Sequence, residues 1–186
     1  MPKASTICFA FFILLWQPAS AQTAETKGYF GIGLRNIAES NSEDSFNGGQ
    51  DFDGSGYSLT FGRTLSRSVS WEFNFSRDDY DSFDVGSASL SVETETIGFS
   101  FIFAADNTAA ATPYLRLGWG NRDASGSARF SDGSSTSLDD AIDSDTGLWY
   151  GVGMKFGASE GVSLNIEAAV VAEDTTAILI GPQFYF

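Results

Sequence analysis

The chain has 186 residues, a net charge of −14 and a single cysteine, Cys8. The length predicts one domain, and the negative charge argues against a nucleic-acid partner, because nucleic-acid-binding surfaces are basic. Aromatic residues make up 15% of the chain, with 20 glycines and only 4 prolines, a composition that favours β-strands with an aromatic face.

The first 21 residues have the features of an export signal. Lys3 supplies a basic start, residues 7–16 form an apolar run, and Ala19 and Ala21 frame an A-x-A cleavage site. The run is too short to cross a bilayer as a helix, which needs about 20 residues. We therefore expect a signal peptide over residues 1–21 and an exported outer-membrane β-barrel domain over residues 22–186. Cys8 leaves with the signal, so the exported domain has no disulfide.

After the signal, apolar and polar residues alternate in a series of segments, which is the period of a β-strand. We expect eight strands, at about residues 27–37, 57–65, 69–77, 87–104, 113–121, 147–156, 162–171 and 176–186. In the fourth of these, Leu90 and Val92 lie on the opposite parity from the later apolar residues, which predicts either a bulge or an extension beyond the bilayer.

Long and short connections alternate between these strands. Polar segments follow the first, third and fifth strands, at residues 36–56, 78–86 and 122–146, whereas most of the other connections are short. An up-and-down barrel in the outer membrane has short turns on the periplasmic side and longer loops outside. The pattern therefore places the long, acidic connections on the outer surface.

The composition of the two strand faces separates a membrane barrel from a soluble one. One face is aliphatic or aromatic, while the other carries glycine, serine, threonine, asparagine and a few charges. A soluble barrel such as a lipocalin needs its apolar face inside, and the second set is too small and polar for such a core. We expect an all-β, eight-stranded antiparallel up-and-down transmembrane β-barrel; an exported soluble lipocalin-like binder is the less favoured alternative.

Several segments carry a family resemblance. They are residues 112–118 (TPYLRLG), residues 151–156 (GVGMKF), residues 161–164 (GVSL) and the aromatic end at Phe184, Tyr185 and Phe186. Together with the signal peptide, they resemble the small outer-membrane β-barrel family of Gram-negative bacteria, the OmpA/OmpX-type and opacity-protein-like barrels. The resemblance implies a location in the bacterial outer membrane. It also implies that the outer-membrane barrel assembly machinery recognises the last strand, with Phe184, Tyr185 and Phe186 as the assembly signal.

Five charged residues fall on the inward face of the predicted strands: Arg35, Glu72, Arg116, Lys155 and Glu167. An eight-stranded barrel is just wide enough to be filled by side chains, and an unpaired buried charge is costly. We expect Glu72 and Glu167 to pair with Arg116 and Lys155, with Arg35 nearer the outer end. Such a network would plug the lumen; the alternative is a narrow porin-like channel for small solutes.

Catalysis and cofactor binding are not expected. The chain has no histidine, the residue that the enzymes among outer-membrane barrels use, so we predict no catalytic, cofactor or metal site. Residues 51–56 (DFDGSG) look like the start of an EF-hand loop, but Gly62 stands where the bidentate acid is required, so we expect only a turn-rich loop there.

The outer connections hold most of the 24 acidic residues. We expect a non-enzymatic protein that contributes to envelope structure or surface interaction. Outer-membrane lipid and lipopolysaccharide are its expected surroundings, and divalent cations are candidate partners of the acidic loops.

Overall fold

The computed structural model describes residues 26–39, 52–80, 82–105, 110–138, 145–157, 161–172 and 175–186. The predicted signal peptide, with Cys8, Ala19 and Ala21, lies outside these residues and stays a prediction. In the described part of the chain, no helix is both long and apolar enough to cross a membrane.

The described residues form ten strands. They are β1 (Gly28–Glu39), β2 (Phe52–Thr64), β3 (Val69–Tyr80), β4 (Phe83–Val85), β5 (Ala88–Ala104), β6 (Ala111–Phe130), β7 (Ser135–Ser137), β8 (Asp145–Phe156), β9 (Val162–Ala172) and β10 (Thr175–Tyr185).

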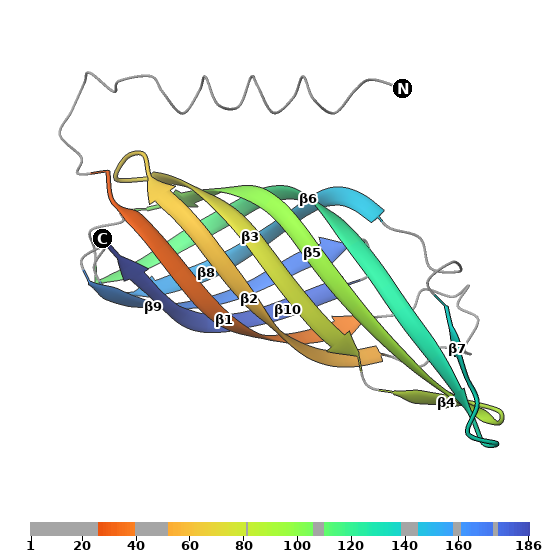
Figure 1. Cartoon of the computed structure of the whole chain (residues 1–186). Coiled ribbons are helices and arrows are strands. Elements are labelled where there is room, and N and C mark those ends of the chain that lie inside the picture. The colour runs from red at the N-terminus through yellow and green to blue at the C-terminus, as the bar shows by residue number, and fades with distance from the viewer. Residues whose placement is uncertain are drawn as a thin grey trace, which may run out of the picture.

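Eight of these strands close into a barrel (Figure 1). Their order around the wall is β1, β2, β3, β5, β6, β8, β9 and β10, and every neighbouring pair is antiparallel. The last strand returns to the first: Gly28 N donates to Phe186 O at 3.1 Å, and Phe186 N donates to Gly28 O at 2.9 Å. Closure leaves the barrel without an open edge, and the predicted eight-stranded antiparallel barrel is confirmed.

One side of the barrel rises far above the rest. β5 has 17 residues and β6 has 20, and they stay paired from Ala104↔Tyr114 to Ala88↔Phe130. The short strands β4 and β7 flank this hairpin at its outer end, where Figure 1 shows it extending beyond the other strands. We call β4, β7 and the outer parts of β5 (residues 88–95) and β6 (residues 121–130) the wing.

The lengths of β2, β3 and β6 correct three expectations about loops. The predicted connections at residues 78–86 and 122–146 are largely strand, because β3 continues to Tyr80 and β6 to Phe130. β2 begins at Phe52, so residues 52–56 of the EF-hand-like segment are extended strand and not a turn-rich loop; Asp51 lies outside the described residues. The pairing of β5 runs without a register shift, so the bulge is wrong and the extension is right.

The polarity of the wall reverses where the wing begins. In the lower part of β6, outward Trp119 is 57% exposed and inward Arg116 is buried. Two residues further along the outward face stands Asn121, and in the wing it is Val92 and Leu90 of β5 that point inward. On the neighbouring strand β5 the same change comes between outward Ile97, which is paired with Asn121, and Glu95. Because outward apolar side chains are expected where hydrocarbon surrounds the barrel, these two steps indicate the outer edge of the membrane.

Candidate functional site

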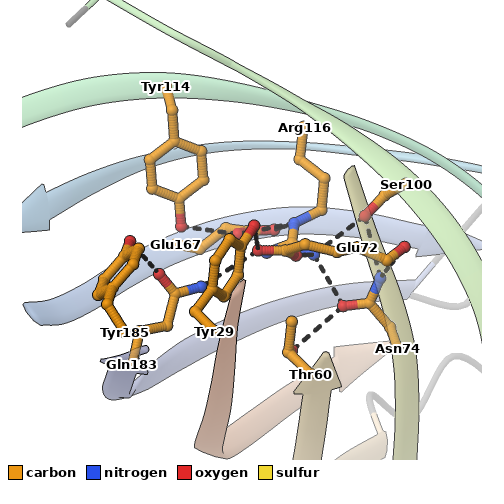
Figure 2. A network of polar contacts seen from close by, with 10 residues as sticks. All are labelled: Tyr29, Thr60, Glu72, Asn74, Ser100, Tyr114, Arg116, Glu167, Gln183 and Tyr185. Carbon is orange, nitrogen blue, oxygen red and sulfur yellow. Dashed lines mark hydrogen bonds and ion pairs between the residues drawn. The ribbon is translucent and has the colours of Figure 1, made fainter. Parts of the chain in front are cut away.

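Arg116 lies at the centre of the lumen, between two carboxylates from different strands (Figure 2). Its Nε is 2.8 Å and 2.9 Å from the two carboxylate oxygens of Glu167, and its Nη1 donates to Glu72 Oε2. Glu72 is 1% exposed, Glu167 4% and Arg116 8%. β3 and β6 direct their even-numbered residues into the barrel, and β9 directs its odd-numbered residues inward. Because the barrel is narrow, this alternation brings the three side chains together.

Neutral donors complete the shells of the two carboxylates. Tyr29 Oη donates to Glu72 Oε1 at 2.9 Å, and Gln183 Nε2 donates to the same oxygen at 3.1 Å. Tyr114 Oη donates to Glu167 Oε2 at 2.8 Å. A buried ion pair is stable only when further hydrogen bonds replace lost water, and these three donors meet that requirement.

A second group of neutral residues holds the far end of the Arg116 guanidinium. Nη1 donates to Asn74 Oδ1 at 2.9 Å and to Ser100 Oγ at 3.3 Å. Asn74 Nδ2 in turn donates to Ser100 Oγ at 2.9 Å, and Thr60 Oγ1 donates to Asn74 Oδ1 at 3.2 Å. Figure 2 shows Asn74 and Ser100 in contact with the guanidinium and Thr60 in contact with Asn74. These bonds orient the guanidinium.

Arg35 belongs to a separate pair towards the outer end. Its Nη1 is 3.3 Å from Asp78 Oδ2, with both side chains buried. Arg122 lies in the same region, where its Nη2 donates to Tyr80 Oη at 2.6 Å. The sequence pattern predicts a loop at residues 78–86, so Asp78 is not among the predicted inward charges. The inward parity of Glu72, continued along β3, includes Asp78.

Lys155 is buried at the end of the lumen near the short turns, with its ammonium 5.9 Å from the centroid of the Tyr185 ring. The predicted pairing of Lys155 with the carboxylates stays a prediction. A pocket of about 20 Å³ lies beside it, lined also by Asn165 and Gln183. This volume accommodates about one water molecule, so the pocket is too small for a solute.

Trp149 points into the lumen next to the Arg116 network and is buried there. Its indole lies over β5 and β6, against the inward glycines Gly98, Gly118 and Gly120. Their missing side chains leave the space that the ring occupies. Any residue larger than glycine at these positions would meet the ring within 3 Å.

An apolar cluster covers the outer end of the lumen. Ile37 and Ala177 are 0% and 2% exposed, Tyr80 is buried beside them, and Val92 and Val171 pack against the group. The outer end of the lumen thus combines an apolar cluster with the polar groups of Arg35, Asp78 and Arg122 beside it.

The proposed assembly-signal residues line the seam between the first and last strands. Phe184 stacks on Phe30, with ring centroids 4.8 Å apart. Tyr185 points inward and donates to Gln183 Oε1 at 3.0 Å. Phe186 points outward and is 68% exposed. The outward rings face lipid, while the tyrosine contributes to the polar lumen.

The wing carries charged residues on its outward face, directly above the apolar band. Arg77 Nη2 pairs with Glu93, and Arg77 Nη1 is 3.4 Å from Glu95. At the tip, Asp132 Oδ1 accepts from Ser134 N at 2.9 Å and from Ser134 Oγ at 2.6 Å. Hydrogen bonds from the Ser134 side chain and backbone lower the pKa of the Asp132 carboxyl. Among the described residues, no group of three or more histidine, cysteine or acidic side chains is placed to hold a metal ion.

Comparison with known proteins identifies the family. The model of the outer membrane protein beta-barrel domain matches residues 7–181, which is most of the chain. No curated protein sequence matches the chain.

Solved structures of bacterial outer-membrane barrels have the same fold. Neisserial surface protein A superposes with a TM-score of 0.61 at 16% identity, covering 86% of this chain and 97% of that one. Ail, the attachment invasion locus protein of Yersinia pestis, gives 0.56 at 17% identity, covering 87% and 99%. OprG of Pseudomonas aeruginosa gives 0.53 at 14% identity, covering 86% and 96%.

The outward apolar band, the polar lumen, the closed eight-stranded wall and the family match agree with one another. The chain belongs to the outer-membrane β-barrel family, and it is a bacterial outer-membrane protein.

Proposed function

We propose that this protein is a non-enzymatic barrel with a sealed lumen, and that it acts in envelope structure and surface interaction through its outer part. The observation that carries the proposal is the filling of the lumen by Trp149. Because the indole lies against three glycines of β5 and β6, the space that small residues would leave open is occupied.

The Arg116 network supports the same conclusion. Its guanidinium is held by two carboxylates and by Asn74 and Ser100. Moving it would leave two buried carboxylates unpaired, which costs several kcal/mol, about 3–5 in comparable proteins. Arg116 would have to move aside to let a solute pass through a porin-like channel, and these contacts oppose that movement.

The outer surface favours a partner of positive charge. Glu93, Glu95 and Asp123 lie on the outward parity of the wing, where Arg77 pairs with both glutamates and Arg129 is an outward cation further along β6. The three acids thus outnumber these two cations. Ail of Yersinia pestis was crystallised with the heparin analogue sucrose octasulfate. We propose that this wing takes cationic ligands in place of sulfated ones, because like charges repel across a shared surface.

The remaining partners follow from the same geometry. We expect the outward acidic residues above the apolar band, such as Glu93 and Glu95, to lie near the lipopolysaccharide headgroups, where divalent cations would be needed to bridge them to phosphates. The aromatic end of β10 is the proposed contact for the barrel assembly machinery.

Planar-bilayer recording tests the sealed lumen. We expect the wild-type barrel to give no conductance above the bilayer background. The double variant W149A/R116A should conduct, because it removes both the ring and the guanidinium that fill the lumen. Leu148→Ala is the matched control, since Leu148 is 77% exposed on the lipid face. Regular single-channel steps from the wild type would overturn the proposal and favour the narrow channel.

Ligand capture tests the charge of the wing. We expect the barrel in detergent to bind immobilised polylysine and not heparin, with the double variant E93Q/E95Q weakening polylysine binding. Asp145→Asn, on the neighbouring strand β8, is the control for general loss of charge. Equal binding of the wild type to immobilised polylysine and to immobilised heparin would contradict the proposed preference for cationic ligands.

A further inference from the structure

Pro182 leaves a gap in the seam that closes the barrel. β10 pairs with β9 through consecutive residues, including Pro182↔Leu164. Against β1, however, no pair occurs between Gly31↔Gln183 and Leu34↔Ile180. Proline has no backbone N–H to donate, so its missing donor lies on the β1 side, and the gap is confined to that seam.

The strands remain close together across the gap. By register, Ile32 lies opposite Pro182, and its carbonyl would accept from an N–H at position 182. A Cβ built on Gly181 would lie 1.9 Å from Ile32 O and 2.6 Å from Gly33 Cα. Glycine at 181 therefore lets the carbonyl approach the backbone of β10, where only a weak C–H···O contact can replace the ladder bond.

The gap lies in a part of the wall that faces hydrocarbon. Ile32 and Ile180 are 48% and 45% exposed on the lipid face. An unpaired backbone group at membrane depth is expensive, so the proline weakens the closed barrel. We therefore look for an advantage of the proline during folding and assembly of the barrel.

The relevant stage is the barrel before closure. The β1-facing side of β10 is then an open strand edge, and such edges pair with other chains and aggregate. Proline on an edge strand blocks this pairing, because it interrupts the row of donors. Pro113 differs: it lies at the rim of the β5–β6 seam, where Ala105 N donates to Pro113 O at 3.1 Å, and a short turn joins these two strands.

We propose that Pro182 protects the open edge of β10 from pairing with a second copy of this chain, at the cost of one ladder bond in the closed barrel. The protection acts while β9 and β10 are paired and β1 has not yet arrived. The proline thus reduces aggregation during assembly and lowers the stability of the closed β1–β10 seam.

Refolding of P182V from urea into lipid vesicles tests both effects of the proline. Valine suits the lipid face and restores the N–H. We expect the folded variant to unfold about three- to tenfold more slowly on heating in SDS, in line with one added hydrogen bond. We also expect at least about twofold more protein in the aggregate pellet during refolding, rising with protein concentration.

P113V is the matched control, because it adds one N–H at an outward-facing residue of the β5–β6 seam, which is not the seam that closes the barrel. Its aggregation should equal that of the wild type. P182A repeats the test with a smaller side chain in case valine does not fit.

Three results would overturn the proposal. Aggregation of P182V and P182A equal to the wild type would remove the protective role, whatever the stability. Faster unfolding of both variants would show that the strand needs proline for its shape. Variants that stay unfolded yet monomeric would show that the restored edge does not recruit other chains.

Discussion

The indole of Trp149 lies directly on the backbone of Gly118: a Cβ built on Gly118 would lie 1.7 Å from Trp149 Nε1. On the next strand, a Cβ built on Gly98 would lie 2.3 Å from Cη2 of the same ring. The largest side chain inside the barrel is therefore paired with the smallest residues of the facing wall. This pairing determines whether the lumen is filled or open.

Gly118→Ala should displace the Trp149 ring and destabilise the barrel by about 1–3 kcal/mol, the usual cost of overpacking. Urea unfolding in lipid vesicles, followed by tryptophan fluorescence, measures the change in the free energy of unfolding. Gly147→Ala is the control, because its added methyl group would meet only Asp145 Oδ2, at 3.9 Å, and should change stability by under about 0.5 kcal/mol. Equal effects of the two variants would contradict the packing described.

Arg116→Met should destabilise the barrel by about 3–5 kcal/mol, because it leaves Glu72 and Glu167 buried without a cation. The triple variant R116M/E72Q/E167Q should recover most of this loss, since all three buried charges are then gone. Equilibrium unfolding in urea checks both values. A triple variant as unstable as R116M would show that the hydrogen-bond geometry, and not the charge balance, holds the lumen together.

The alternation of the chain was sufficient to predict the barrel and the inward direction of Glu72, Arg116 and Glu167. Strand parity is a local property, and the narrow barrel then leaves inward charges few places to go. The contact of Trp149 with Gly118 and Gly98 could not be predicted in this way. It depends on the stagger between β8, β6 and β5, which no single strand encodes.

The wing was missed for a different reason. Residues 122–146 are rich in serine, aspartate and glycine, which favour loops, yet residues 122–130 continue β6 because β5 pairs with them. Tertiary pairing overrides local preference here. The change of parity at Leu90 and Val92 was the one sequence signal. It left open a bulge or an extension beyond the bilayer, and the unbroken pairing of β5 decides for the extension.

Spin labels on β6 should locate the membrane edge. Leu117 and Ser125 both point outward, eight residues apart along the strand. We expect a label at L117C to be relaxed by oxygen, which concentrates in lipid, and a label at S125C by a water-soluble nickel complex. The only native cysteine is Cys8, in the predicted signal peptide, so each labelled variant carries one reactive thiol. Similar accessibility at both sites would place the wing inside the bilayer and contradict the polarity change between Trp119 and Asn121.

The tip of the wing should lose order as the pH falls. Ser134 holds the Asp132 carboxylate through its hydroxyl and its backbone N–H, and these bonds lower the pKa of Asp132. A carboxyl with a lowered folded-state pKa stabilises its turn above the ordinary aspartate pKa, and the stabilisation is lost as the pH falls through the folded value. Carbon-detected NMR titration should therefore place the Asp132 midpoint below the ordinary aspartate range. Ser134→Ala should raise the midpoint, because the hydroxyl bond is lost, whereas Ser131→Ala should leave it unchanged. An ordinary midpoint in the wild type would mean that the turn does not hold the carboxylate in solution.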